Sequence, residues 1–373
     1  MEEIPAGHID VTNFRYRSTP YPMLECTVPG LSQEAFDRNW KPKAASLMCV
    51  DSVTRKYVVF QPLSAAKLDK PSTTANITTN KNTNVGANPP CNTENSTSET
   101  ADWKSREGAK DNSMEEAQTQ ENIQTFLGWR RIVTERLAFG SCTEFTLSRD
   151  LFDPNVPKAR LDFRFTLAYV GACTLAIRTE FFALGEGVPK SRLWTCTYQL
   201  VMVDKETRQP TTVPKWFLDE YQGRGCMKQP LVIRPFRKPG RTYCHPVLVQ
   251  WSNTDEFGHA TWSSYVHWAV DALHAALLPR RDGGTPTERQ SKRGRAVRGS
   301  EALRGITTEI MKRGLSKFQV GYYKECLEGD HVDVHVWQEG EREEVFCSLL
   351  REDEEVSQVK LVYFTEDGEE GGF

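Results

Sequence analysis

The sequence lacks several features that would identify common classes of protein. No apolar run approaches the roughly 20 residues that a membrane-spanning helix needs, so we expect no membrane span. The N-terminus, MEEIPAGHID, has neither the apolar segment of a secretory signal nor the Arg-rich pattern of a transit peptide. The motifs G-x-S-x-G, Walker A, G-x-G-x-x-G and H-E-x-x-H are also absent. These absences disfavour the commonest hydrolases, nucleotide-binding folds and zinc proteases.

The cysteines are isolated along the chain. All 10 of them lie outside any C-x-x-C pair and outside any Cys/His spacing that is typical of a metal site. Isolated thiols are typical of a reducing compartment, where they act as small buried side chains. The sequence therefore predicts a cytoplasmic protein with no metal and no other cofactor. The net charge of -3 provides no overall attraction to nucleic acid or to a membrane surface.

Length and composition predict two domains with a polar interruption. A chain of 373 residues is too long for one compact core, and a hydrophobic share of 38% is low for a chain that folds throughout. Residues 66–122 are rich in Thr, Asn, Ser, Lys and Glu and have almost no aliphatic side chains, so we expect a disordered insertion. The expected domains are residues 1–222, which this insertion interrupts, and residues 230–373.

Strand-like segments occur in both halves of the chain. RLDFRFTLAYV alternates apolar and polar residues, and CTLAIRTEFFAL and LWTCTYQLVMVD follow it, which predicts an antiparallel meander. Downstream, HPVLVQW predicts a strand and SSYVHWAVDALHAALL a helix. Four more strand-like segments then follow, from KFQVGYY to QVKLVYF. This order predicts an α+β architecture in which a helix packs against a sheet.

The first half fits the same order of elements. FRYRSTPY would be its opening strand, and SQEAFDRNWKPKAASLMCV would be its helix, with Ser32 as a candidate N-cap. Pro42 would kink or shorten that helix. The order of elements therefore predicts an internal repeat.

One segment combines chemistry with a suitable backbone. VLVQWSNTDEFGHATWSSYVHWAVDAL places Asp255, Gly258 and His259 just before the helix, which is expected to open between Thr261 and Ser264. The N–H groups at a helix start carry partial positive charge, and a glycine lets a substrate oxygen approach them. Such a position polarises a carbonyl as an oxyanion hole does. A carboxylate and an imidazole beside it can activate water or position a substrate.

These residues also resemble a known family. W-x-x-x-D-x-x-G-H before a helix bearing Tyr and Trp is similar to the hotdog thioesterases, above all the plant and bacterial acyl-acyl-carrier-protein thioesterases. The resemblance implies two hotdog domains in tandem, each a long helix wrapped by an antiparallel sheet. Asp255 and His259 match the Asp and His of the family's D-x-N-x-H segment. GYYKEC places Glu325 on its catalytic Glu and Cys326 on the neighbouring Cys.

The activity that the resemblance implies is hydrolysis of a fatty acyl thioester, with acyl-CoA or an acyl-carrier protein as substrate. Glu325 or Asp255 would be general base or nucleophile, and His259 would orient the substrate or share the proton. The implied substrate-binding residues are Gly258, Phe257, Thr261, Trp262 and Cys326. The tandem arrangement would make the chain a monomeric pseudo-dimer, or a homodimer of such chains. Residues 279–304, which are Gly-rich and basic, would be a solvated loop or a loop facing the phosphate groups of the carrier.

The sequence departs from the family in two places. Phe257 stands where the family has an Asn and cannot form its hydrogen bonds, and Thr261 and Trp262 replace an Asn pair. Trp262 would narrow the acyl tunnel. A non-catalytic acyl-binding or scaffold protein with a degenerate site therefore remains the alternative. The first half offers no matching signature at residues 21–30, where the repeat would place it, so this domain is expected to lack catalytic residues.

Each candidate also has a structural explanation. Asp255 would simply cap a turn, His259 would be a buried histidine with a backbone partner, and Glu325 would face solvent. Cys326 is expected to be a packing residue rather than a nucleophile. Three side chains alternate on one expected strand in a way that imitates a metal site, but the outward face of an amphipathic strand explains them better. These are His331, Asp333 and His335.

Overall fold

The structure is a computed structural model, and it describes most of the chain. The described residues are 11–37, 42–60, 63, 67–68, 125–185, 190–255, 258–278, 299–340 and 343–366. Nearly all of the predicted insertion at residues 66–122 lies outside these ranges, although its first residues form the short strand β3 (Lys67–Leu68). Most of the basic loop at residues 279–304 also lies outside them.

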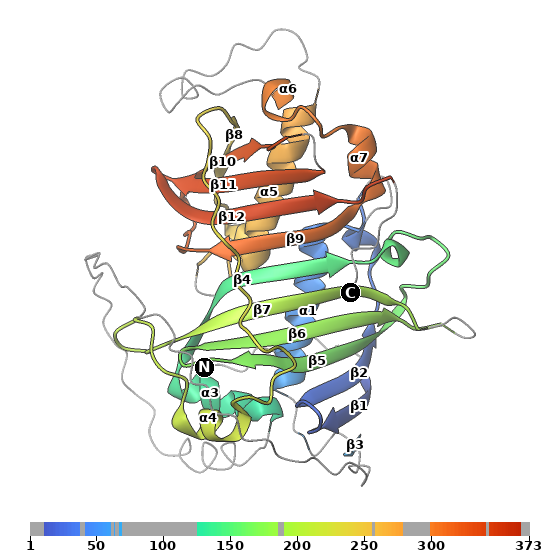
Figure 1. Ribbon diagram of the computed structural model, residues 1–373, viewed down its shortest axis with the longest axis vertical. Coiled ribbons are helices and arrows are strands. Elements are labelled where there is room, and N and C mark those ends of the chain that lie inside the picture. The colour runs from blue at the N-terminus through green and yellow to red at the C-terminus, as the bar shows by residue number, and fades with distance from the viewer. Residues whose placement is uncertain are drawn as a thin grey trace. The chain divides into compact units, whose positions relative to one another are not determined.

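The described strands form a 12-stranded sheet in the order β3-β1-β2-β5-β6-β7-β4-β9-β12-β11-β10-β8 (Figure 1). The remaining strands are β1 (Thr12–Arg17), β2 (Met23–Pro29), β4 (Leu137–Leu147), β5 (Arg160–Val170), β6 (Thr174–Ala183), β7 (Arg192–Val203), β8 (Tyr243–Leu248), β9 (Leu315–Tyr322), β10 (His331–Trp337), β11 (Glu344–Arg351) and β12 (Glu354–Tyr363). The helices are η1 (Gln33–Ala35), α1 (Ala44–Val59), η3 (Phe126–Gly128), α3 (Trp129–Glu135), η4 (Arg149–Leu151), α4 (Lys215–Tyr221), η5 (Trp251–Asn253), α5 (Trp262–Leu277), α6 (Gly299–Ala302) and α7 (Thr308–Arg313).

The same unit occurs twice along the chain. In the first half, from β1 to α4, the repeated elements are β2, α1, β4, β5, β6 and β7. In the second half, from β8 to β12, they are β8, α5, β9, β10, β11 and β12. The spatial order β2-β5-β6-β7-β4 matches β8-β10-β11-β12-β9 strand for strand. This confirms the predicted internal repeat and the α+β architecture.

The two halves join edge to edge. Strand β4 pairs antiparallel with β9, from Cys142 opposite Gly321 to Thr146 opposite Lys317. Across this joint the rings of Phe145 and Phe318 stack with their centroids 4.5 Å apart. Hydrogen bonds and aromatic packing therefore connect the two sheets into one.

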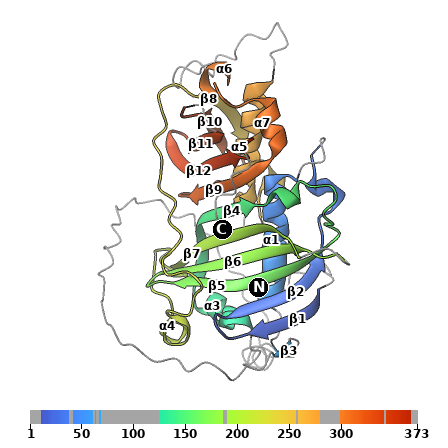
Figure 2. The ribbon, with the colours of Figure 1, turned by 45° about the vertical axis from the view of Figure 1, so that its right-hand side comes forward.

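Helices α1 and α5 lie on the same face of the sheet (Figures 1 and 2). Helix α5 buries most of its predicted apolar stripe against the strands, and only Leu277 at its end is half-buried. The stripe recurs every three or four residues, so one side of the helix is apolar along its whole length. The buried members are Tyr265, Trp268, Ala269, Ala272, Leu273 and Ala276.

The first half differs from the predicted assignment at its start. FRYRSTPY contributes to β1, but the counterpart of β8 is the next strand, β2. The long helix begins at Ala44 instead of near Ser32, which precedes the short η1. Pro42 explains the shift, because a proline lacks the N–H that a helix interior uses and disfavours helical geometry in the residue before it.

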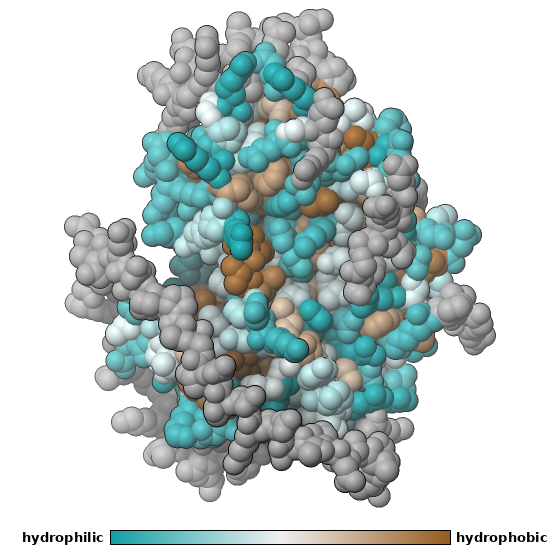
Figure 3. Space-filling view, in the orientation of Figure 1, coloured by the Kyte–Doolittle hydropathy of each residue, from teal (hydrophilic) through white to brown (hydrophobic). Residues whose placement is uncertain are grey.

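The linker, residues 222–242, runs along the face opposite the helices (Figures 1 and 2). Phe236 exchanges two hydrogen bonds with the Gln358 side chain, and its ring packs against those of Trp337 and Phe346. Apolar surface is visible among polar side chains on the face along which the linker runs (Figure 3). The linker therefore covers part of a sheet face that would otherwise meet water.

The prediction that His335 lies on an outward, solvent-facing side of β10 is wrong. Its side chain is only 9% exposed, and Nδ1 lies 2.8 Å from Oγ1 of Thr242 at the end of the linker. Burial lowers the pKa of His335 to about 4. His331, on the same strand, is exposed as predicted. Among the residues that the structure describes, no group of three or more His, Cys, Asp or Glu side chains is placed to hold a metal.

Candidate active site

The turn between η5 and α5 presents His259. The backbone N–H of Asp255 donates to the carbonyl of His259 at 2.8 Å, and Oδ1 of Asp255 accepts from the N–H of His259 at 3.1 Å. Gly258 has a φ of 77°, a left-handed conformation that strains any residue with a Cβ. The Asp255 side chain thus closes a tight turn, as its structural explanation predicted. Phe257 lies outside the described residues.

A loop after β9 presents Glu325 beside this turn. The N–H of Ala260 donates to the carbonyl of Cys326 at 2.7 Å, which ties the loop to the turn. On its other side, Arg351 donates to the carbonyl of Glu325 and to the Asp330 carboxylate, both at 3.0 Å. The loop backbone is therefore held from two directions, although the Glu325 side chain reaches the surface.

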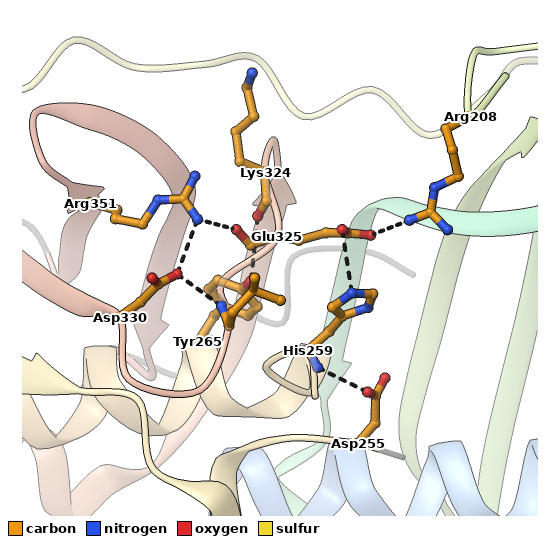
Figure 4. Close-up of polar contacts among 9 residues, drawn as sticks. Arg208, Asp255, His259, Tyr265, Lys324, Glu325, Asp330 and Arg351 are labelled. Carbon is orange, nitrogen blue, oxygen red and sulfur yellow. Dashed lines mark hydrogen bonds and ion pairs between the residues drawn. The ribbon is translucent and has the colours of Figure 1, made fainter. Parts of the chain in front are cut away.

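The side chains of His259 and Glu325 converge (Figure 4). Nε2 of His259 lies 3.6 Å from Oε2 of Glu325, and the two side chains are 27% and 46% exposed. Both are therefore accessible to a ligand from solvent. The structure brings two of the three predicted catalytic side chains into contact, while Asp255 bonds to the His259 backbone from the other side of the turn.

Helix α5 starts next to the pair, at the place that the sequence predicted. Thr261 is its N-cap residue and Trp262 its first helical residue. The side chain of Ser264 donates to the carbonyl of Asn253 at 2.8 Å, which fixes the helix start against η5. The first N–H groups of a helix have no partners within the helix and point outward from its start, so this position favours a negatively charged oxygen.

Cys326 lies inside this loop, fully buried. Burial raises the pKa of its thiol, which disfavours the thiolate that a nucleophile needs. The geometry agrees with the expectation that Cys326 is a packing residue.

One member of the site was missed by the sequence reasoning. Arg208, in the turn after β7, lies with Nη2 3.4 Å from Oε1 of Glu325 (Figure 4). Its guanidinium also lies 5.0 Å from the ring centre of Phe139. The Glu325 carboxylate therefore sits between the imidazole of His259 and a cation from the first half. No local pattern marks Arg208, because its partner is 117 positions away in the sequence.

The first half repeats the turn with different side chains. The bridge between Thr254 and Ala260 precedes α5 as the bridge between Phe36 and Pro42 precedes α1. Counting from these bridges places Asp37 where Asp255 stands, and in the sequence Lys41 where His259 stands. The prediction that the matching segment lies at residues 21–30 was therefore wrong.

The counterpart of Glu325 follows from the ends of the matching strands β4 and β9. Tyr322 ends β9 as Leu147 ends β4, and Glu325 and Asp150 each come three residues later. The Asp150 carboxylate accepts a hydrogen bond from the hydroxyl of Ser191. The first half thus holds carboxylates at both positions, and Asp150 has a hydroxyl partner where Glu325 has His259.

Comparison with known proteins supports the fold. No protein-family model matches the chain, and no curated protein matches it in sequence. A solved Lactobacillus plantarum protein named as an oleoyl thioesterase is similar to it with a TM-score of 0.54 and 12% identity, over 93% of this chain and 98% of that one. A 12:0-ACP thioesterase from Umbellularia californica is similar with a TM-score of 0.51 and 9% identity, over 92% and 97% of the two chains. At such identities the likeness shows the fold alone, and with the repeated strand order it confirms two hotdog units in tandem.

No helix in the described part of the chain is both long and apolar enough to cross a membrane.

Proposed function

We propose that this protein hydrolyses an acyl thioester at the site formed by His259, Glu325 and the start of α5. The observation that carries the proposal is the 3.6 Å approach of His259 Nε2 to Glu325 Oε2 beside that helix start. An imidazole and a carboxylate in contact, both accessible from solvent, are suited to moving a proton from water. The two similar solved proteins, both named as thioesterases, support the same reaction class.

In this reaction Glu325 is the base, His259 shares the proton that Glu325 takes, and the start of α5 binds the oxyanion. Glu325 takes a proton from a water molecule, and the water oxygen attacks the thioester carbonyl carbon. The negative charge that forms on the carbonyl oxygen faces the first N–H groups of α5. When the carbon–sulfur bond breaks, the proton passes to the departing thiolate, so the products are a free acid and a thiol.

The supporting residues act through the backbone and through charge. Asp255 holds the turn that presents His259, so we assign it a positioning role and leave the base to Glu325. Arg208 holds the Glu325 carboxylate on the side opposite His259. Since both members of the Arg208 ion pair are about half exposed, the pair contributes less than about 1 kcal/mol to stability.

A turnover assay tests this proposal directly. The purified protein is mixed with a panel of acyl-CoA and acyl-carrier-protein thioesters, and the released thiol is followed with a thiol-reactive chromophore. We expect turnover that Glu325→Gln and His259→Ala remove. Normal turnover by both variants, or no turnover of any thioester by the wild type, would refute the proposal.

The alternative is a non-catalytic acyl-binding or scaffold protein. The contact that favours it is the Arg208–Glu325 ion pair, because it occupies one oxygen of the carboxylate that would act as the base. Mass spectrometry of the protein after incubation with acyl-CoAs separates the two functions. Retained intact acyl-CoA indicates binding alone, and free acid indicates hydrolysis.

The proposed function also implies a carrier for the acyl group and a cellular location. We propose acyl-CoA or an acyl-carrier protein as the substrate, on a chain whose two joined halves already form a pseudo-dimer. A cytoplasmic location is consistent with the cysteines of the described ranges, all of which are free thiols.

A further inference from the structure

The helix of the first half carries a buried ion pair. Asp51 of α1 is fully buried, and Nε of Arg55 lies 3.1 Å from its Oδ2, with 13% of the Arg55 side chain exposed. The hydroxyl of Thr179 on β6 donates to the other oxygen of Asp51. Asp51 and Arg55 lie seven and eleven residues after the start of α1, and the matching positions of α5 are Ala269 and Leu273. The second half therefore has an apolar core where the first half has charges.

Two aromatic rings connect Arg55 of this ion pair to the start of α5. The guanidinium carbon of Arg55 lies 4.4 Å from the ring centre of Tyr198 and 5.0 Å from that of Trp262. The ring centroids of Trp262 and Tyr198 are themselves 5.2 Å apart, and those of Trp262 and Phe145 are 6.5 Å apart. The hydroxyl of Tyr322 donates to the carbonyl of Trp262 at 3.3 Å. The first residue of α5 is thus fixed between both helices and the joint of the sheet.

This arrangement blocks the way inward from the proposed site. A thioester carbonyl at the start of α5 must send its acyl group either to solvent or between the helices and the sheet. On the inward route the acyl group meets the Trp262 ring, and behind it the Asp51–Arg55 pair. An alkyl chain that extends further must displace an indole or contact buried charges, and neither change gains the free energy of apolar burial.

We propose that Trp262 and the Asp51–Arg55 pair close the inner end of the acyl site, so that the site accepts short acyl groups such as acetyl to butanoyl. This inference rests on the proposed function for the position of the carbonyl. It adds the substrate class: a short-chain thioester already fills the site, and methylenes beyond butanoyl length add no affinity because they find no apolar surface to be buried against.

The test measures binding, so that it does not depend on turnover. The ligands are S-(2-oxoalkyl)-CoA analogues from propyl to dodecyl, which keep the carbonyl and cannot be hydrolysed, and Kd is measured by titration calorimetry. For the wild type we expect Kd to change little beyond the analogue of butanoyl length. Each methylene that becomes buried would tighten binding roughly fourfold.

Two changes open the route in steps. Trp262→Ala removes the ring, and adding Asp51→Ala/Arg55→Leu places the residues of α5 at the same positions of α1. The added changes should leave the protein folded, because apolar residues can replace a buried ion pair without loss of stability. We expect binding to tighten over the few methylenes that replace the indole in Trp262→Ala, and over longer chains in the combined variant. Trp251→Ala is the matched control, since its indole is 78% exposed outside this route, and it should keep the wild-type profile.

The outcomes separate the two proposals. Wild-type binding that tightens with each methylene up to dodecyl, or variants with the wild-type profile, would overturn the closed inner end. The expected binding profile without turnover of any thioester supports the closed end and refutes hydrolysis. Failure to bind any analogue overturns the closed inner end, and the turnover assay on both carriers then decides on hydrolysis by itself.

Discussion

The two halves of the molecule share a fold and differ in the side chains that the fold presents. Each half has a short helix, a turn that contains an aspartate, and a long helix that begins two residues after a bridge. In the second half the turn presents His259 toward Glu325. In the first half the counterpart of Glu325 is Asp150, which bonds to Ser191. The backbone therefore provides the helix start twice, whereas the described side chains bring an imidazole and a carboxylate together in the second half.

The two halves also differ in the side chains of their cores and of their outer sheet faces. Helix α1 buries charges where α5 buries Ala269 and Leu273. On the other face of the sheet, Arg164 in the first half forms partly exposed ion pairs with Glu25 and Glu180. The second half has the buried, linker-covered His335 on that face. The same fold therefore accommodates side chains of different polarity and burial at equivalent positions of its two halves.

The largest expected effect tests whether catalysis is confined to one half. Glu325→Gln should lower turnover by about a hundredfold to ten-thousandfold, because general base catalysis typically supplies this factor. Asp150→Asn, at the matching place, should leave kcat close to wild type. Steady-state kinetics on one thioester measure both, with Glu328→Gln on the same exposed loop as the control. Equal losses for Glu325→Gln and Asp150→Asn would contradict the assignment of the site to the second half.

The next effect concerns the charged core of the first half. Asp51→Ala leaves Arg55 unpaired, so the free energy of unfolding should fall by about 3–5 kcal/mol. Adding Arg55→Leu should restore most of that loss, because the core then resembles that of α5. Urea unfolding of the three proteins measures this. A double variant as unstable as the single one would show that the first half depends on the charges themselves.

A third effect is the pH dependence of stability that the buried His335 gives to the outer face of the second half. Because the pKa of His335 is lowered from 6.5 to about 4, folding favours its neutral form. Its contribution is fully present above pH 6.5 and is lost as the pH falls toward 4, a decrease of about 3 kcal/mol in the free energy of unfolding. His335→Gln should flatten this part of the profile, whereas His331→Gln, exposed on the same strand, should not. A wild-type slope in His335→Gln would assign the pH dependence to other groups.

The smallest effect concerns the turn. Asp255→Ala removes the acceptor for the N–H of His259 and should lower the free energy of unfolding by about 1 kcal/mol. Asp255→Asn keeps an acceptor oxygen and should lose less. Thermal unfolding measures the difference, and turnover should fall less in either variant than in Glu325→Gln. A turnover loss as large as that of Glu325→Gln would assign Asp255 a catalytic role.

The sequence predicted the regular elements well because their signals are local. The strands around Phe163 and Phe165, and helix α5, follow from apolar periodicity alone. The meeting of His259 with Glu325 came from a family resemblance, since the two residues lie 66 positions apart and no local pattern shows the contact. Arg208 and the burial of His335 were missed because each depends on a partner or a linker that only the folded chain brings near.

The pairing of β4 with β9 bears on what happens if the chain is cut. A protease that cleaves the linker would leave two fragments that still pair through the hydrogen bonds of β4 and β9, so cleavage need not release either fragment. Each fragment produced alone would instead expose a bare strand edge, which readily recruits another strand. Two such polypeptides, expressed from separate genes, would find in each other the partner that the intact chain provides in cis.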